Sequence, residues 1–345
     1  MSKQLILDVL RGATSERPPF WLMRQAGRYL PEYRKLRADA GSFMDLCLTP
    51  KLAAEVTLQP IRRFRPDGAI LFSDILIIPY GLGQSLRFEE GVGPVLEPVE
   101  NSSDLSRLSP DGSWSQIEAT YETVSRVSQD LPEDVALIGF AGAPWTVATY
   151  MVEGRSSKDF AKIKQWAFSD PKGFSALIDM LVEATIRHLG SQIEAGASIV
   201  KLFDSWAGVL APDQFETWVI QPIRRITDQL KQDYPQIPII GFPKGAGVQY
   251  RAFVEQSGVD AVALDTSVPT EWAAREIQPL MPVQGNLDPI ALVAGGDVMR
   301  SAAARIRTNL GGGPFVFNLG HGVIPITPPE HVEELARFLR EPNQN

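Results

Sequence analysis

Residues 198–206 read SIVKLFDSW, an apolar run that passes directly into the polar pair Asp204 and Ser205. A helix-like segment precedes this run, with apolar residues spaced three and four apart from Phe174 to His188. A buried strand that follows a helix and ends in polar residues is typical of a parallel sheet. We therefore expect Ser198–Phe203 to form one strand of such a sheet.

The same alternation recurs along the chain and predicts eight strands, at Phe20–Met23, Ala69–Phe72, Ala136–Phe140, Ser198–Phe203, Ile237–Phe242, Ala261–Leu264, Met281–Gln284 and Phe315–Asn318. Eight parallel strands separated by helices favour a closed barrel. Residues 85–98 depart from the alternation, because they read as two short strands around Glu90-Gly91-Val92-Gly93. The sequence thus predicts an α/β fold, a distorted (β/α)₈ TIM barrel with a β-hairpin inserted after strand 2.

No internal repeat, low-complexity tract or Pro/Ser-rich linker divides the sequence, so we expect a single domain over residues 1–345. A doubly wound open sheet is the alternative fold. Proline-containing signals predict three helix starts, at Thr49-Pro50, at Asp170-Pro171 and at Thr327-Pro-Pro-Glu330. The last of these also has the spacing of a capping box.

Composition narrows the class of protein. The 33 Lys+Arg and 41 Asp+Glu residues give a net charge of -8, which disfavours non-specific binding to nucleic acid or to anionic membranes. The lone Cys47 excludes an intrachain disulfide framework and a Cys-rich metal site. The early apolar stretch Leu5–Leu10 is too short for a signal segment or a membrane span. A soluble enzyme of the cytoplasm fits these features best.

Polar residues follow most of the predicted strands. In a (β/α)₈ barrel the active site is built from the C-terminal ends of the strands, so these residues are expected to face one cleft there. They are Arg24 and Arg28, Asp74, Asp204 and Ser205, Lys244, Asp265, Asn286 and Asp288, and His321.

Arg24 and Arg28 are four residues apart, and the small Ala26 and Gly27 between them allow close approach of a ligand. Two guanidinium groups in this arrangement indicate bidentate recognition of carboxylates. The alternative is that both arginines form ion pairs with Asp or Glu on a surface helix.

Asp74 stands alone among apolar neighbours, where its charge needs a cation or several hydrogen-bond donors. It is a candidate for binding ligand N–H groups, and its alternative role is to cap a helix after the strand. Tyr150, on a helix opened by Pro144, is a candidate donor to an acidic ligand or else a packing residue. Ser205 is either a ligand contact or a cap.

His321 lies between two glycines, which makes it the best candidate among the three histidines. His188 falls on the apolar stripe of its helix and reads as a core residue, while His331 lies near a helix start. Lys201 and Lys244 lie near strand ends, where a desolvated lysine can form a Schiff base with a carbonyl. Nothing in the sequence around them supplies a second cation that would lower their pKa.

Six segments resemble the uroporphyrinogen decarboxylase family, and the resemblance extends from near the N-terminus to the last helix. They are Arg24-Gln-Ala-Gly-Arg-Tyr-Leu-Pro-Glu-Tyr-Arg34, Phe72-Ser-Asp74-Ile, Gly142-Ala-Pro-Trp-Thr146 with Thr149-Tyr-Met-Val-Glu-Gly154, Phe203-Asp-Ser-Trp206, Gln284-Gly-Asn-Leu-Asp-Pro289 and Asn318-Leu-Gly-His-Gly322. The first, of eleven residues, is highly specific. The sequence departs from the family pattern at Thr266, where an aromatic residue commonly follows the aspartate.

The resemblance implies a homodimeric carboxy-lyase that converts the four acetate side chains of uroporphyrinogen III to methyls and gives coproporphyrinogen, a step towards heme and chlorophyll. It implies no metal and no organic cofactor. It also implies that the substrate's own protonated pyrrole ring accepts electrons during the loss of carbon dioxide. The catalytic residues would be Asp74, Arg24 and Arg28, and the substrate-binding residues would be Arg24, Gln25, Ala26, Gly27, Arg28, Asp74, Tyr150, Ser205 and His321, with Arg37 as an addition.

Two other functions compete with this hypothesis. A corrinoid or thiol methyltransferase shares the barrel but resembles a zinc enzyme with His and Cys ligands, and a chain with Cys47 alone lacks that ligand set. A non-catalytic tetrapyrrole-binding protein would keep the arginines but would not need a polar residue at Asp74. The presence of both features favours catalysis.

Overall fold

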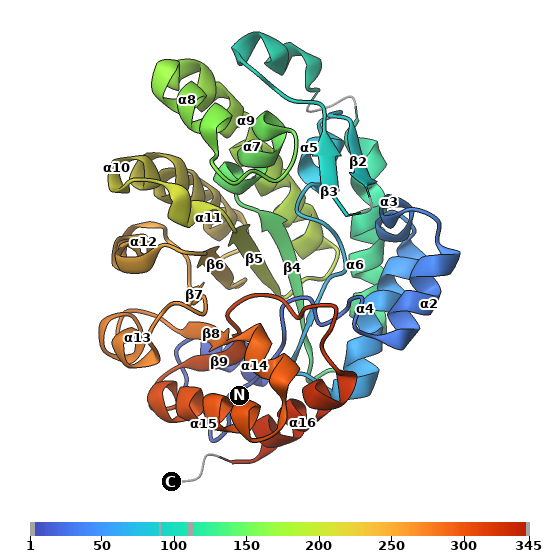
Figure 1. Cartoon of the computed structure of the whole chain (residues 1–345), viewed down its shortest axis with the longest axis vertical. Coiled ribbons are helices and arrows are strands. Elements are labelled where there is room, and N and C mark those ends of the chain that lie inside the picture. Colours follow the sequence, from blue (N-terminus) through green and yellow to red (C-terminus); the bar gives the residue numbers. More distant parts are fainter. Residues whose placement is uncertain (1–3, 90, 110–112, 343–345) are drawn as a thin grey trace.

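A curled parallel sheet of seven strands forms the centre of the computed structural model, which describes residues 4–89, 91–109 and 113–342 (Figure 1). The strands are β1 (Gly68–Ile70), β4 (Ala136–Gly142), β5 (Ile199–Asp204), β6 (Ile239–Pro243), β7 (Ala261–Ala263), β8 (Val283–Leu287) and β9 (Phe315–Leu319). They follow one another in the sheet in their order along the chain. In a doubly wound sheet the strand order reverses, so the observed order excludes that alternative fold.

Seven of the eight expected strands are therefore present, and the expected strand Phe20–Met23 is the exception. Within it only Phe20 forms a bridge, which is parallel and pairs with Phe317 of β9. The preceding Pro18 and Pro19 have no N–H to donate to a strand ladder. At Arg24 the backbone turns into the left-handed region, with φ at 60°. The segment nevertheless lies between the two edges of the sheet, because Phe20 also accepts a hydrogen bond from the Asp67 N–H at 2.8 Å.

Helices cover the convex side of the sheet (Figure 1). The main ones are α4 (Pro50–Phe64), α6 (Glu118–Asp130), α9 (Pro171–Glu194), α11 (Gln221–Asp233), α12 (Tyr250–Gln256), α13 (Thr270–Glu276), α15 (Gly296–Leu310) and α16 (Pro329–Arg340). The others are α1 (Leu5–Leu10), α2 (Pro31–Asp39), α3 (Phe43–Cys47), α5 (Ile77–Gly81), α7 (Pro144–Glu153), α8 (Ala161–Ser169), α10 (Pro212–Phe215), α14 (Pro289–Ala294), the 3₁₀ turns η1 (Ser102–Arg107), η2 (Trp114–Ile117), η3 (Ala207–Val209) and η5 (Gly247–Gln249), and the π turn η4 (Glu216–Ile220).

The structure tests the three helix starts that the sequence predicts. Asp170 caps α9 through a hydrogen bond from the Gly173 N–H at 2.9 Å, and Pro50 opens α4 as expected. The capping box at Thr327 is wrong, because α16 begins at Pro329 with Pro328 in the cap position and no side-chain cap bond. The Thr327 hydroxyl is instead buried.

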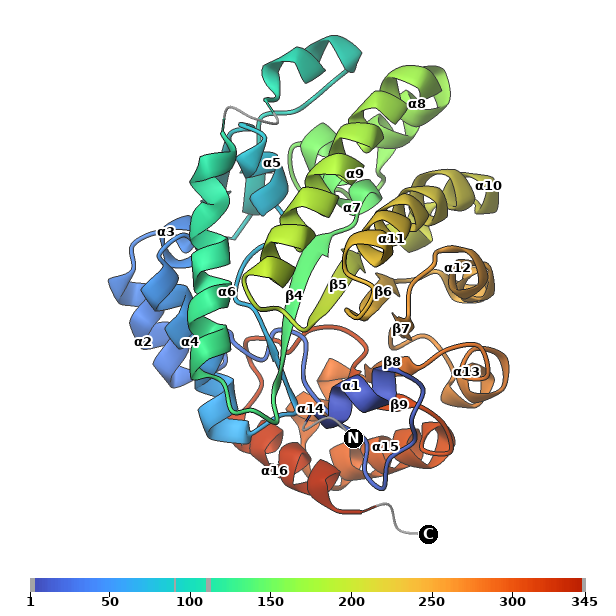
Figure 2. The same cartoon turned by 180° about the vertical axis from the view of Figure 1, so that it is seen from behind.

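Burial follows the alternation of side chains along the strands. On β5, Val200 and Leu202 pack against the outer helices, while Ile199 belongs to a second apolar cluster on the concave side of the sheet. Helix α1 covers the N-terminal ends of the strands (Figure 2), where the Gln4 amide donates to the Val135 carbonyl at 3.1 Å. The C-terminal ends are left uncovered by this helix.

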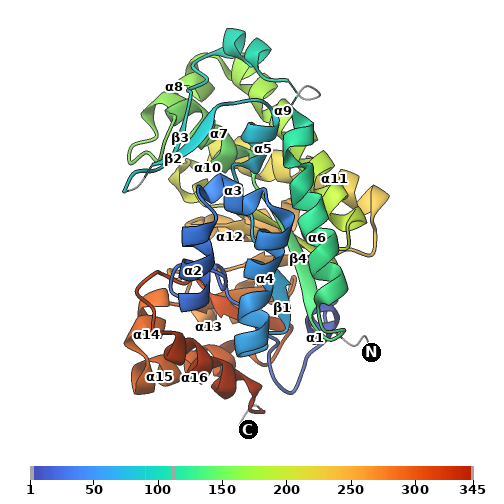
Figure 3. The same cartoon turned by 90° about the vertical axis from the view of Figure 1, so that its right-hand side faces the viewer.

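β2 (Leu86–Glu89) and β3 (Gly93–Leu96) pair antiparallel in a separate two-stranded sheet. They occupy the segment where a hairpin is expected, and its expected turn residue Glu90 lies outside the described residues. Figure 3 shows this pair at the end of the molecule opposite to α15 and α16. Within the described ranges, no helix is both long enough and apolar enough to cross a membrane.

Candidate active site

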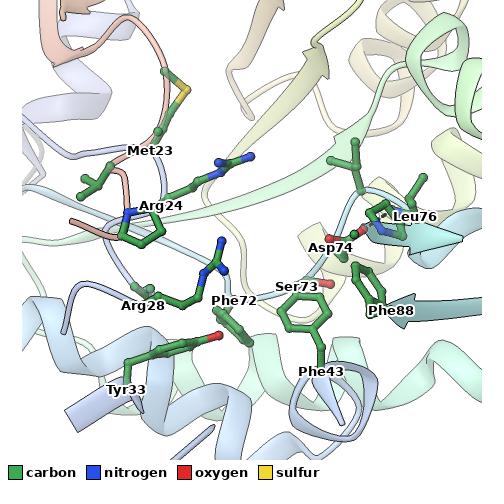
Figure 4. Close-up of a pocket in the computed structure, with 18 of the residues that line it drawn as sticks. Met23, Arg24, Arg28, Tyr33, Phe43, Phe72, Ser73, Asp74, Leu76 and Phe88 are labelled. Carbon is green, nitrogen blue, oxygen red and sulfur yellow. Dashed lines mark hydrogen bonds between the residues drawn. The ribbon is translucent and has the colours of Figure 1, made fainter. Parts of the chain in front are cut away.

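A cleft of about 1120 Å³ opens at the C-terminal ends of the strands (Figure 4). Its walls come from the loop that leads into α2, from the loop after β1, from the β2–β3 pair and from residues 321–325. Nine of the ten predicted site residues line it: Arg24, Ala26, Gly27, Arg28, Arg37, Asp74, Tyr150, Ser205 and His321. The structure therefore brings together residues that lie almost 300 positions apart.

Arg24 is held in place by hydrogen bonds from β9 and from the loop after it. The N–H of the preceding Met23 donates to the Asn318 Oδ1 atom at 2.9 Å, and the Met23 carbonyl accepts from the Val323 N–H at 2.8 Å. The left-handed backbone of Arg24 is costly for a residue with a Cβ, so the surrounding bonds must impose it. This conformation sends the side chain into the cleft, as Figure 4 shows.

The two guanidinium groups are free to bind a ligand. Figure 4 shows the side chains of Arg24 and Arg28 pointing into the same part of the cleft, with Asp74 across from them. Among the described residues, neither guanidinium takes part in an ion pair or a hydrogen bond. Glu89, the other acidic residue of the lining, is bound to Arg87 at 2.7 Å. The alternative interpretation, in which Arg24 and Arg28 form structural ion pairs, is therefore wrong.

Arg34 holds the backbone at Arg28 through hydrogen bonds, a role that the sequence does not predict. Its Nη1 atom donates to the carbonyls of Arg28 at 2.9 Å and of Tyr29 at 3.1 Å. Because α2 starts at Pro31, Arg34 lies on its first turn and can reach back to this loop. The only sign of this role in the sequence is that Arg34 belongs to the eleven-residue segment 24–34.

Gln25 is the one predicted site residue that does not line the cleft. Its side chain is buried, with Oε1 accepting from the Leu22 N–H and Nε2 donating to the Gly68 carbonyl, both at 3.1 Å. The side chain therefore points away from the cleft, and its contact with substrate stays a prediction. Gln25 instead connects the loop that carries Arg24 and Arg28, the arginine loop, to the start of β1.

Asp74 is half-buried in the loop between β1 and α5. One oxygen accepts a hydrogen bond from the Leu76 N–H at 2.8 Å, so the residue does order the turn ahead of the helix. Burial raises the pKa of Asp74, against the opposing effects of that N–H and of the Arg24 charge. Its second oxygen has no bonded partner among the described residues, which leaves an acceptor directed at a ligand.

The remaining lining residues offer neutral donors. Burial, together with the nearby charges of Arg24 and Lys244, lowers the pKa of His321 to about 4, so its ring is neutral near pH 7 in the empty cleft. Burial raises the pKa of Tyr150, which keeps its hydroxyl protonated. Both can donate a hydrogen bond to a carboxylate.

Five strand-end residues expected to face the cleft do not line it: Asp204, Lys244, Asp265, Asn286 and Asp288. Four of them, all but Lys244, have internal partners that explain this. Asp204 is buried and accepts from the Thr146 hydroxyl at 2.5 Å, and burial raises its pKa to about 7. Asp288 caps α14 through the Ile290 N–H. The Asn286 amide donates to the carbonyls of Asp265 and Val268.

Asp265 organises the loops after β6 and β7. It accepts hydrogen bonds from the Gly245 N–H at 2.7 Å, the Tyr250 hydroxyl at 3.0 Å and the Ser267 hydroxyl at 2.5 Å. Although burial works in the opposite direction, these bonds lower the pKa of Asp265. The neighbouring Thr266 packs against Gly320, whose missing side chain leaves room for it.

The lining residues do not resemble a metal site. Within the described ranges, no group of three or more His, Cys, Asp and Glu side chains lies close enough to hold a metal ion. The chemistry available in the cleft is that of two unpaired guanidinium groups, one carboxylate without an ion-pair partner and several neutral donors.

Comparison with known proteins gives relatives over the whole length of the chain. The sequence profile "Uroporphyrinogen decarboxylase (URO-D)" matches residues 1–342. The uroporphyrinogen decarboxylase of Rhodospirillum rubrum is 54% identical over 336 residues, which cover 97% of each chain. That of Sphingopyxis alaskensis is 53% identical over 339 residues, which cover 98% of each chain.

Two solved structures share the fold at low sequence identity. A methyltransferase from Methanosarcina mazei superposes with a TM-score of 0.83 at 18% identity, and the match covers 98% of both chains. A B12-independent methionine synthase from Shewanella sp. superposes with a TM-score of 0.57 at 10% identity over 94% of both chains. At these identities the likeness concerns the fold alone.

Proposed function

The chain belongs to the uroporphyrinogen decarboxylase family and is a carboxy-lyase, and from this premise we propose that its cleft decarboxylates the four acetate arms of uroporphyrinogen to give coproporphyrinogen. The observation that supports this site most directly is the set of two unpaired arginines facing one half-buried carboxylate. A carboxylate-rich ligand with central N–H groups matches that set in both charge and geometry.

Substrate binding would rest on Arg24 and Arg28, with Arg37, which also donates to the Gly41 carbonyl, as a further lining residue. They provide local positive charge on a protein whose net charge is -8. Gly27 and Ala26 let the substrate approach the loop, and Tyr150, Ser205 and His321 would add hydrogen bonds to further carboxylates. Gln25 and Arg34 would act indirectly, since they hold the arginine loop in place.

The chemical step exchanges a carboxyl group for a proton. Cleavage of the bond between the methylene and the carboxylate carbon leaves an electron pair on the pyrrole-bound methylene, and a proton added to that carbon completes the methyl group. If the pyrrole ring is protonated beforehand, it accepts the electron pair during cleavage. An anionic Asp74 close to the pyrrole N–H groups would stabilise this cationic ring, and the positive charge of the ring would in turn lower the pKa of Asp74 and keep it anionic.

Three further expectations accompany this proposal. Residues 1–345 would form one domain, a distorted (β/α)₈ barrel in which the segment around Phe20 takes the place of the first strand; its bonds to Asp67 and Phe317 support this. The reaction would need no metal and no organic cofactor. The homodimer and the cytoplasmic location remain predictions from the sequence.

Two alternatives are weaker. A corrinoid or thiol methyltransferase function is favoured only by a fold likeness at 18% identity, and the described residues contain no group suited to zinc. A tetrapyrrole-binding protein without activity would not require Asp74 at the centre of the cleft.

The test is anaerobic incubation of metal-stripped protein with uroporphyrinogen, followed by counting the carboxyl groups lost. We expect stepwise loss of four carboxyl groups without added metal. Tight binding with no loss would favour the binding protein, and activity only after addition of zinc would overturn the cofactor-free reaction.

A further inference from the structure

Lys201 lies in the middle of β5 and is completely buried. Its neighbours Val200 and Leu202 pack against the outer helices, so the alternation of the strand places Lys201 on the concave side of the sheet. Charged side chains are almost never fully buried without a partner. The proposed reaction assigns it no task.

The amine is surrounded by aromatic rings and sulfur. Its Nζ atom is 4.9 Å from the ring centroids of both Trp21 and Phe203, 5.2 Å from that of Phe242, and 4.0 Å from the Met23 Sδ atom. None of these four side chains is titratable. Among the described residues, no carboxylate is within ion-pair distance of Lys201. The Trp21 ring next to the amine donates a hydrogen bond to Gln284 of β8, which is also a neutral residue.

These surroundings act on the two forms of the amine in opposite ways. Burial without a counter-ion lowers the pKa of Lys201 well below its ordinary value, so the neutral form is favoured while the cleft is empty. Three ring faces within about 6 Å of the amine are nevertheless a favourable place for an ammonium group. A nearby negative charge would therefore shift the balance towards the charged form.

The cleft lies directly above this amine. Met23, Phe203 and Phe242 contact Lys201 from one side and line the cleft on the other. A bound ligand would be separated from the amine by a single layer of apolar side chains, across which charges interact more strongly than through water. The substrate of the proposed function carries a carboxylate on every arm, and each turnover step removes one.

We propose that Lys201 is a positioning residue that takes up a proton from solvent when the acidic substrate fills the cleft and releases it when the less acidic product leaves. The charge beneath the floor then favours the ligand with more carboxylates, which promotes both substrate binding and product release. This inference rests on the proposed function, because it needs a poly-acid in the cleft.

Proton uptake on binding tests the inference directly. Calorimetric titration with uroporphyrinogen, under anaerobic conditions and in buffers of different ionisation enthalpy, gives the number of protons taken up; every protein compared also carries Asp74→Asn, so that decarboxylation does not itself consume protons. At a pH between the lowered pKa of Lys201 in the empty cleft and the ordinary lysine value of 10.5, we expect the wild type at position 201 to take up as much as about one proton more than Lys201→Met. The ratio of the affinities for uroporphyrinogen and coproporphyrinogen should also fall roughly tenfold in that variant.

Lys35→Met is the matched control, because Lys35 is exposed on α2 and does not line the cleft. It should leave the proton uptake unchanged. Equal uptake in the wild type and in Lys201→Met would overturn the inference even if turnover proves the proposed function. Should Lys201→Met not fold, ¹⁵N NMR of the Lys201 amine in the wild type, with and without substrate, decides the matter: an unchanged protonation state would refute the inference.

Discussion

Gly322 lies directly against the side chain of Arg24, and a Cβ atom at Gly322 would come within 2.6 Å of the Arg24 Cγ atom. Gly322→Ala should therefore displace the Arg24 guanidinium without removing its charge. We expect kcat/KM for uroporphyrinogen to fall roughly tenfold, since misplacement of a binding group by about 1 Å has large effects on rate. The unfolding temperature should change little. Gly312→Ala is the control, because a Cβ there meets no atom within 4 Å; an equal loss in both variants would contradict this view of Gly322.

Asp74→Asn nearly preserves the shape of the side chain but removes its charge. If Asp74 stabilises a cationic ring during cleavage, kcat should fall on the order of 100-fold or more while the substrate dissociation constant changes little. Single-turnover measurements alongside equilibrium binding separate the two effects. A similar loss in both would assign Asp74 to binding only.

Arg28→Ala should weaken substrate binding by about tenfold or more, because one carboxylate loses its bidentate partner. The loss should shrink as salt is added, since Arg28 is exposed and its charge is screened. Lys35→Ala removes a positive charge from the same region of the chain, on α2, without touching the cleft lining. Equal binding losses in the two variants would indicate a general charge effect and no specific grip by Arg28.

His188 makes the fold sensitive to acid. It is buried on α9, its Nδ1 atom lies 3.1 Å from the Tyr121 hydroxyl, and burial lowers its pKa to about 3 from an ordinary value of 6.5. The unfolded chain binds a proton at this position before the native chain does, so the free energy of unfolding should fall as the pH decreases from about 6.5 to about 3. The contribution of this one residue is on the order of 4 kcal/mol.

Denaturant unfolding of the wild type and of His188→Gln over this pH range measures that contribution as a difference. The variant should lose less stability on acidification. Parallel curves for the two proteins would show that other groups account for the acid sensitivity.

Strand order and most of the site followed from the sequence because apolar runs and the polar residues after them mark parallel strands. The direction of individual side chains did not follow. Gln25 sits between cleft-lining residues, yet its amide turns inward to the backbone of Leu22 and Gly68. Arg34 reads as another surface arginine until its contact with the Arg28 carbonyl is seen.

The sequence also predicts the wrong role for loop residues whose hydrogen-bond partners lie in distant segments of the chain. Asp265 follows a strand like Asp74 does, but hydrogen bonds from Gly245, Tyr250 and Ser267 commit it to the loops. These partners come from separate segments, so spacing along the chain carries no sign of them. At Thr327, two consecutive prolines determine where α16 begins, and the hydroxyl is buried in place of capping the helix.

The bonds around Phe20 also constrain the order in which the protein can fold. Its parallel bridge partner, Phe317, lies in the last strand of the sheet, so on a ribosome this contact has to wait until nearly the whole chain has been made. Until then, the segment around Phe20 lacks its partner on the β9 side, and an unpaired strand edge is the kind of surface on which chains associate wrongly. We therefore expect a nascent chain of this protein to be more prone to wrong association before β9 is made than after β9 has paired with the Phe20 segment.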